Sequence, residues 1–278
     1  MIKTLFSLIL IVFLGPILLS TAYGNHFNGL VGDPKLKSAS ALVVDGRGEL
    51  IYGKDIDTIR PVASISKLLT AMVIIDSEMD LEAKITVTKA DRDLVQLTGS
   101  RLEYGATLSR REMIMIAIMA SENRAAAVLG RTFPGGLARF VAEMNKKAAL
   151  LGMSNSNFAD PAGLKIENVS TASDLIKLVT ATETYDLIKK ASTTQQLEVR
   201  PYHGRGPLTY GNTNRLLKNK NWSIALSKTG YINESGRCLV MQAIIEGEPV
   251  TIVLLNSFGK LTPFGDSNRL RQWMLANS

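Results

Sequence analysis

Apolar runs and their spacing divide the chain into strand-like ends and a helical middle. Residues 39–54 hold two short apolar runs around a Gly-Arg-Gly turn, which predicts a β-hairpin. Three more β-like runs, 222–232, 237–245 and 250–257, follow one another through short polar turns. Strands joined by short turns pair antiparallel, and the hairpin can complete their sheet. We therefore expect an α/β chain of the α+β kind with one antiparallel sheet.

The middle of the chain shows helical periodicity. We expect a first helix over 60–76, where a proline, two serines and a lysine precede an apolar run. Ser109 and Glu112 match a capping box, and residues 113–120 behind them are apolar on every side of a helix. A helix with no polar face must lie at the centre of a fold, so this second helix is predicted to be buried.

Further segments complete the predicted order. Apolar residues at helical spacing from 137 onward stop at Gly152, which predicts a helix with a glycine C-cap, and Thr171 opens another helix. Residues 192–221 are rich in Thr, Asn, Gly and Pro, which favours a loop with a short hairpin. A last helix is expected near 266–276. The order is therefore two strands, a long helical block, three strands and a helix.

The first residues carry an export pattern. Lys3 precedes an apolar stretch over 5–19, and small residues follow at 20–22. We expect 1–24 to be a cleaved signal peptide, followed by an N-terminal tail over 25–37. An uncleaved anchor is the alternative, but a stretch this short, broken by Gly-Pro, falls below the roughly 20 residues that span a bilayer. The protein is therefore expected outside the cytoplasm, with no transmembrane anchor after cleavage.

Composition narrows the function classes. With 278 residues and 46% hydrophobic content, the chain can bury a large core, which excludes disordered and fibrous classes. The net charge of +7 favours an anionic polymer as partner, or a surface tuned for solubility. Nucleic acid is not expected, because the chain is predicted to be exported and shows no basic-aromatic interleaving. The single cysteine, Cys238, has no internal partner and is expected in the core.

The number of histidines and cysteines in the sequence excludes several kinds of catalytic site. The chain has two histidines, His26 and His203, and no Gly-x-Ser-x-Gly turn, so a Ser-His-Asp triad is not expected. One cysteine and two scattered histidines do not give a zinc site of ordinary spacing. No cofactor signature or phosphate-binding glycine loop appears, so we expect neither a cofactor nor a metal.

Ser64 and Lys67 offer a way to activate a serine without histidine. Side chains three apart share a helix face, with Cβ atoms about 5–6 Å apart. Apolar neighbours can desolvate the lysine so that it acts as a base, and unpaired N–H groups at the helix start favour an oxyanion. Helix capping with a solvated lysine is the alternative. Ser66 points off this face and is assigned a packing or local hydrogen-bonding role, and Ser257 with Lys260 repeats the spacing without a helix start.

Two more polar groups stand in apolar surroundings. Ser121 and Asn123 end the central helix, where polar groups are costly unless paired, so they either cap the helix or line a cleft. Lys228, Thr229 and Gly230 lie inside a predicted strand. A glycine there lets another backbone approach, which suits an extended peptide along the strand, with Lys228 and Thr229 available for its carboxylate.

Taken in order, Ser-x-x-Lys at 64–67, Ser-x-Asn at 121–123 and Lys-Thr-Gly at 228–230 resemble the motifs of the penicillin-binding proteins and serine β-lactamases. The stretches RPVASISKLLTAMV, DPAGL and LSKTGYINESGRCLVM are similar to the low-molecular-mass D-alanyl-D-alanine peptidases, most of all to endopeptidases of the penicillin-binding protein 7 type. The resemblance implies a β-lactamase/transpeptidase-like fold over 38–278. A five-stranded antiparallel sheet flanked by helices would carry an inserted helical subdomain, roughly over 78–190.

The resemblance implies a role for each motif residue. Ser64 would be the nucleophile that forms an acyl-enzyme, Lys67 the base that takes its proton, and Ser121 the relay of a proton to the leaving amine, helped by Lys228. The implied substrate-binding residues are Asn123 for a peptide carbonyl or amide, Lys228, Thr229 for a carboxylate, Gly230, and Tyr231, whose N–H would form an oxyanion hole with that of Ser64.

The activity implied by the resemblance is that of a serine D,D-endopeptidase. It would hydrolyse D-alanyl cross-links between peptidoglycan stem peptides in the periplasm, with β-lactam antibiotics as covalent inhibitors. A D-alanyl-D-alanine carboxypeptidase is the alternative; that branch usually carries a β-rich C-terminal domain and an anchoring helix, whereas this chain stops at Ser278. A β-lactamase would need a deacylating glutamate, and Glu167 lies in a peptidase-like loop. A non-catalytic wall-binding or penicillin-sensing protein would be expected to lack a motif residue, and none is missing.

Overall fold

One antiparallel sheet gathers strands from both ends of the chain. The computed structural model describes residue 27 and residues 29–277, so the predicted signal peptide lies outside the described residues. The five-stranded sheet has the order β2-β1-β11-β10-β9. Its strands are β1 Ser40–Asp45, β2 Leu50–Lys54, β9 Ser223–Ile232, β10 Gly236–Ile245 and β11 Glu248–Ser257. The predicted hairpin and C-terminal strands are therefore confirmed, and they share one sheet.

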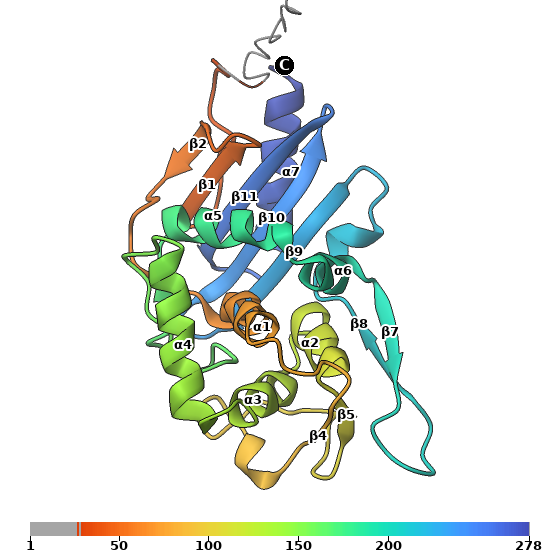
Figure 1. Ribbon diagram of the computed structural model, residues 1–278. Helices are drawn as coiled ribbons and strands as arrows, with labels where there is room; N and C mark the ends of the chain where they lie inside the picture. The colour runs from red at the N-terminus through yellow and green to blue at the C-terminus, as the bar shows by residue number, and fades with distance from the viewer. Residues whose placement is uncertain (1–26, 28, 278) are drawn as a thin grey trace, which may run out of the picture.

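Helices cover both faces of this sheet and extend beyond its lower end (Figure 1). The α-helices are α1 Ser66–Asp76, α2 Arg110–Met119, α3 Asn123–Arg131, α4 Gly136–Leu150, α5 Ala172–Ala181, α6 Asp186–Thr193 and α7 Thr262–Leu275. Successive side chains of a strand point to opposite faces. Accordingly, Leu42 and Val44 of β1 join the core that contains α1, α2 and α5, whereas Ala41 and Val43 join the core under α7.

Short elements connect the sheet with the helices. They are the strand pairs β3 Arg60–Pro61 with β6 Val169–Ser170, β4 Lys84–Thr86 with β5 Thr107–Ser109, and β7 Gln196–Val199 with β8 Leu208–Gly211, and the 3-10 turns η1 Ala63–Ile65, η2 Lys89–Asp91, η3 Thr182–Thr184 and η4 Arg215–Lys218. The hairpin β7–β8 is the one predicted within 192–221, and it projects to one side (Figure 1). Among the described residues, no helix is both long and apolar enough to cross a membrane.

Local sequence signals explain several helix ends. The Ser109 hydroxyl accepts from Glu112 N at 3.1 Å, and a Glu112 carboxylate oxygen accepts from Ser109 N at 2.7 Å, so the predicted capping box opens α2. The interior of α2 is buried, as its uninterrupted apolar sequence predicted. The helix α4 ends just before Gly152, whose φ of +72° is the left-handed conformation that favours glycine. The helix α5 begins after Thr171, as expected.

Other helix boundaries differ from the predictions. The first helix was expected from residue 60, but the α-helix begins at Ser66, after the short strand β3 and the 3-10 turn η1. The helix α3 was missed because its cap is Glu122, which accepts from Arg124 N and is not a usual capping residue. The helix α6 was missed because it has no side-chain cap. The last helix begins one turn early, at Thr262, with Pro263 in its first turn.

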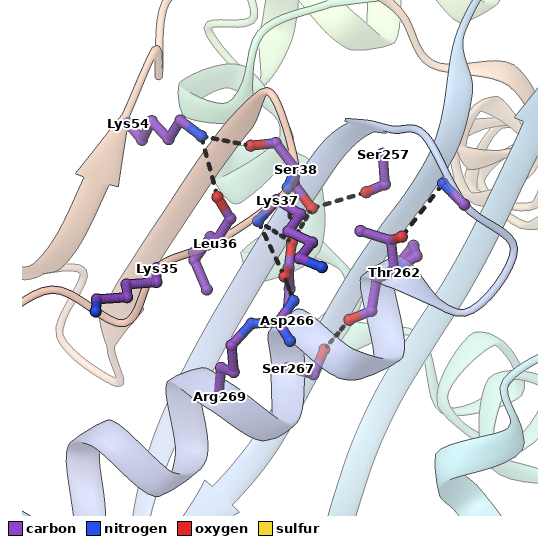
Figure 2. A network of polar contacts seen from close by, with 12 residues as sticks. Lys35, Leu36, Lys37, Ser38, Lys54, Ser257, Thr262, Asp266, Ser267 and Arg269 are labelled. Carbon is purple, nitrogen blue, oxygen red and sulfur yellow. Dashed lines mark hydrogen bonds and ion pairs between the residues drawn. The ribbon is translucent and has the colours of Figure 1, made fainter.

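A buried carboxylate ties the segment before β1 to α7. Asp266 is fully buried and accepts from Lys37 N, from Ser38 N at 2.7 Å and from the Ser38 hydroxyl at 2.5 Å. It also forms an ion pair with Arg269. Figure 2 shows these groups converging on Asp266 from two segments far apart in the sequence. Buried donors need partners, so Asp266 holds the segment that leads into β1 in place.

We expect Asp266→Ala to lower the free energy of unfolding by about 2–4 kcal/mol, because two backbone N–H groups and the Ser38 hydroxyl lose their buried acceptor. Urea denaturation would measure the loss. The control is Asp186→Ala: this carboxylate is 97% exposed and pairs with Lys189, so its removal should cost less than about 0.5 kcal/mol. Equal losses in the two variants would contradict the role given to Asp266.

Candidate active site

The 3-10 turn η1 presents Ser64 to a cleft in front of α1. Ala63, just before it, has a φ of +48°, a conformation that an L-residue adopts only under constraint, and it turns the chain out of β3. In a 3-10 helix, side chains at i and i+3 eclipse one another. The Lys67 Nζ atom accordingly lies 2.7 Å from the Ser64 Oγ atom. The predicted pairing of these two side chains is present, although Ser64 lies in this turn and not in the α-helix.

The amine of Lys67 is fully buried and is surrounded by neutral acceptors. Besides Ser64 Oγ, its Nζ lies 2.8 Å from Asn123 Oδ1 and 2.6 Å from the carbonyl oxygen of Ala162. A neutral amine has two N–H groups and one lone pair. In the neutral form, N–H groups directed to Asn123 and Ala162 would leave the lone pair for the Ser64 hydroxyl, whose oxygen lies 3.4 Å from the Ala162 carbonyl oxygen.

Burial changes the charge state of Lys67. Desolvation lowers the pKa of the Lys67 amine to about 7, although the carboxylates of Asp160, Glu122 and Asp93 act to raise it. A large share of Lys67 is therefore unprotonated at neutral pH. A desolvated amine of this kind can act as a base.

A second hydroxyl and amine stand on the opposite side of the cleft. Ser121 lies between α2 and α3 with a φ of +58°, and its Oγ accepts from Lys228 Nζ at 2.9 Å. Lys228 also donates to the Thr229 carbonyl oxygen at 2.8 Å. Burial, and then the charge of Lys67, lower the pKa of Lys228 well below its usual range. The buried Lys228 amine therefore contacts the cleft-lining Ser121 hydroxyl directly.

The cleft itself has a volume of about 340 Å³ and contains most of the sequence-predicted residues. Its lining consists of Ser64, Ser121, Asn123, Thr213, Thr229, Gly230, Tyr231, Arg237, Cys238, Lys260, Pro263 and Phe264. The Thr229 hydroxyl donates to the Thr213 hydroxyl at 2.7 Å, which pairs two groups on one wall. The Tyr231 ring is 45% exposed, and the Arg237 guanidinium lies over it at 3.6 Å from the ring centre.

Two glycines let backbone segments meet behind the nucleophile. A Cβ on Gly163 would stand 1.9 Å from the Ala63 carbonyl oxygen, and one on Gly230 would stand 2.8 Å from the Val62 carbonyl oxygen and 3.2 Å from Ser64 N. The expectation that Gly230 makes room for a substrate backbone therefore needs correction, because the backbone it admits is the chain's own, at Val62. This contact places β9 directly against the nucleophile.

The sequence analysis missed the loop that holds the Ala162 carbonyl. The carboxylate of Asp160 accepts from the backbone N–H groups of Ala162, Gly163, Leu164 and Lys165, and from Asn168 Nδ2. These bonds fix the loop so that its Ala162 carbonyl faces Lys67. An Asp before Pro-Ala-Gly is a recognisable turn signal, but nothing in the sequence shows that this turn reaches α1.

Other polar residues in the region have local partners. The Ser66 hydroxyl is fully buried and donates to the Ala63 carbonyl at 2.8 Å, in keeping with its predicted local role. Ser257 is buried against Ser38, so the second Ser-x-x-Lys spacing, which includes Lys260, does not form a pair. Glu122, for which no role was predicted, caps α3 and accepts from the Ser100 hydroxyl at 2.6 Å.

The fold and this arrangement, with a buried lysine amine and not a histidine beside a serine hydroxyl, are those of an active-serine enzyme. Residues 29–259 match the family model described as D-alanyl-D-alanine carboxypeptidase, and the chain belongs to this family of serine peptidases. The family and fold expected from the motifs are thereby confirmed.

Two curated relatives cover most of the chain. A D-alanyl-D-alanine endopeptidase of Pseudomonas aeruginosa is 44% identical over 88% of this chain and 80% of its own length. A D-alanyl-D-alanine endopeptidase of Escherichia coli is 43% identical over 87% of this chain and 78% of its own length.

Solved structures of two further proteins have the same fold. A Streptomyces DD-transpeptidase covers 88% of this chain and 100% of its own, with a TM-score of 0.81 and 26% identity. A penicillin-binding protein of Listeria monocytogenes, solved in its cefotaxime-bound form, covers the same shares with a TM-score of 0.77 and 25% identity.

We expect the Lys67 amine to titrate with a midpoint of about 7, well below the value of about 10.4 of a free lysine side chain. NMR of protein labelled with ¹³C at the lysine ε-carbon would measure this midpoint, and Lys67→Arg would assign the signal. Lysine signals that all titrate above pH 9 would show that Lys67 is not a base at neutral pH.

Proposed function

We propose that this chain is a serine D,D-endopeptidase that hydrolyses D-alanyl cross-links between peptidoglycan stem peptides. The observation that carries the proposal is the fully buried Lys67 amine, 2.7 Å from the Ser64 hydroxyl oxygen. The choice of cross-links over terminal residues rests on the relatives. Three relatives named endopeptidase are 44%, 43% and 35% identical, whereas carboxypeptidases of Bacillus subtilis and Streptomyces are 28% identical.

In the proposed first step, neutral Lys67 takes the proton of the Ser64 hydroxyl, and the oxygen attacks the D-alanyl carbonyl carbon. The backbone N–H groups of Ser64 and Tyr231 stabilise the oxyanion that forms. The close approach of Gly230 to Ser64 N supports this role, because it brings the two backbone segments together.

In the second step, the proton that Lys67 took from Ser64 passes through Ser121 to the leaving nitrogen, which returns Lys67 to its neutral form and allows the C–N bond to break. The leaving stem peptide departs as an amine, and the D-alanyl group stays on Ser64 as an ester. Water then attacks the ester, with Lys67 as base, and releases a carboxylic acid and free Ser64. The hydrogen bond from Lys228 to Ser121 supports the relay, because it holds the hydroxyl towards the cleft.

Substrate binding is assigned to the remaining cleft residues. The strand β9 lies at the edge of the sheet, where an extended peptide can add backbone hydrogen bonds near Gly230 and Tyr231. Asn123 would bind a peptide carbonyl or amide, and the Thr229 hydroxyl, paired with Thr213, a carboxylate of the leaving stem.

We also propose that the protein acts in the periplasm after removal of residues 1–24, and that β-lactam antibiotics acylate Ser64. The Listeria relative solved with cefotaxime or ampicillin bound supports the second point. A β-lactamase role is disfavoured by the loop facing Lys67. The Asp160 carboxylate of this loop already accepts hydrogen bonds from several backbone N–H groups, and Glu167 does not line the cleft.

The wild-type protein is expected to release monomers from purified cross-linked muropeptides, and Ser64→Ala is expected to release none. Ser66→Ala is the matched control, because its hydroxyl is bonded locally and should be dispensable for cleavage. Mass spectrometry of the products would read the outcome. Release of free D-alanine alone would move the assignment to a carboxypeptidase, and cleavage of no wall fragment would favour a non-catalytic binding role.

Benzylpenicillin is expected to acylate Ser64 and to leave it slowly, because no glutamate of the described residues lines the cleft as in a class A β-lactamase. Intact-protein mass spectrometry would follow the adduct in the wild type, in Ser64→Ala and in Ser66→Ala. Rapid turnover of a chromogenic cephalosporin would contradict the peptidase assignment, and an adduct that survives Ser64→Ala would contradict the choice of nucleophile.

A further inference from the structure

A carboxylate outside the catalytic cluster organises the loop beside Asn123. Asp93 follows the turn η2 and is 8% exposed. It accepts from the N–H groups of Val95 at 2.8 Å, Gln96 at 2.9 Å and Thr98 at 2.9 Å. Leu97 within this loop has a φ of +54°, so the hydrogen bonds to Asp93 hold a conformation that the chain would otherwise avoid.

Asp93 also determines where the Thr98 hydroxyl proton points. Thr98 Oγ1 lies 2.7 Å from Asp93 Oδ2. Burial acts to raise the pKa of Asp93, but hydrogen bonds from Thr98, Gln96 and Val95 outweigh it and hold the pKa below its ordinary value. An ionised carboxylate only accepts hydrogen bonds, so Thr98 must donate its single proton to Asp93. The Thr98 oxygen is then left as an acceptor, and it lies 2.8 Å from Asn123 Nδ2.

These contacts leave the Asn123 amide one satisfactory orientation. Its Nδ2 must face the accepting Thr98 oxygen, and its Oδ1 then faces Lys67 Nζ at 2.8 Å. In the flipped orientation an N–H of Asn123 would point at the Lys67 amine. It would compete there with the Ser64 hydroxyl for the lone pair that takes the serine proton.

We propose that Asp93 and Thr98 are positioning residues that lock the Asn123 amide, so that the lone pair of Lys67 stays available to Ser64. They act in sequence, from Asp93 through Thr98 and Asn123 to Lys67, and neither is assigned a contact with the substrate. The proposal rests on the proposed function, because it assumes that Lys67 is the base for acylation of Ser64.

The first test compares Thr98→Val with Thr98→Ser. Valine keeps the shape but removes the hydroxyl, whereas serine keeps the hydroxyl. The rate of acylation by benzylpenicillin is expected to fall about tenfold in Thr98→Val, the equivalent of one lost hydrogen bond, and to stay within about twofold of wild type in Thr98→Ser. Thr86→Val is the control, since its hydroxyl pairs with Thr107 away from the cleft. Equal rates in the two Thr98 variants would overturn the proposal.

The pH dependence of acylation separates this role from a structural one. The charged groups around Lys67 are Lys228 and the carboxylates of Asp93, Glu122 and Asp160, and Thr98→Val changes none of them. An amide flipped in Thr98→Val would disfavour the Lys67 ammonium and move the acid limb of the profile to lower pH. A loosened site that admits water would move the acid limb to higher pH. An acid limb that moves to higher pH or does not move in Thr98→Val would overturn the proposal.

A double-mutant cycle tests whether Thr98 acts through Asn123. In the Asn123→Ala background, Thr98→Val is expected to change the acylation rate by less than about twofold. The same tenfold loss in both backgrounds would overturn the proposal. Asp93→Asn, whose amide can itself donate to Thr98, should slow acylation in the Asn123 protein but not in Asn123→Ala. If wild type is not acylated at all, the proposed function fails; if wild type is acylated and the cycle is additive, only this inference fails.

Discussion

The active centre depends on one constraint, a lysine amine held in the protein interior without a contacting carboxylate among the described residues. Keeping Lys67 charged there costs about 5 kcal/mol relative to water, which is the free-energy equivalent of a pKa lowered from 10.5 to about 7. The apolar run of α1 meets this requirement, because its buried neighbours keep water from the amine. The sheet supports the arrangement by carrying a second buried amine, Lys228, on β9.

Two residues beside the cleft have a strained backbone. Ala63 and Ser121 both adopt positive φ, and each lies where an element must turn sharply to aim a hydroxyl into the cleft. Such conformations persist only if neighbouring contacts hold them. Gly163 and Gly230 supply that support, because their missing side chains let two backbone segments pack directly on the turn that carries Ser64. The position of Ser64 is thus set by the packed backbone around it as well as by its own hydrogen bonds.

The sequence predicted the parts of this site that depend on local spacing. Ser64 and Lys67 could be paired because i and i+3 side chains meet in any helical turn, and the strand pattern placed Lys228 correctly. Asp160 and Thr98 could not be found in this way. Their roles depend on where two irregular loops dock in three dimensions, and no periodicity records that. The same reason explains the error at Gly230, whose neighbour in space is 168 residues away in sequence, at Val62.

The placement of acidic residues around Lys67 fits the role of base proposed for it. A carboxylate in contact with the amine would stabilise the ammonium and raise its pKa, which would remove the base at neutral pH. The contacting acceptors are instead neutral, namely a hydroxyl, an amide and a carbonyl oxygen. Asp160 binds the loop that carries the Ala162 carbonyl, and Asp93 lies beyond Thr98, which contacts Asn123; each carboxylate accepts hydrogen bonds from backbone N–H groups. These carboxylates can therefore orient the acceptors of Lys67 rigidly while adding little charge where the proton must leave.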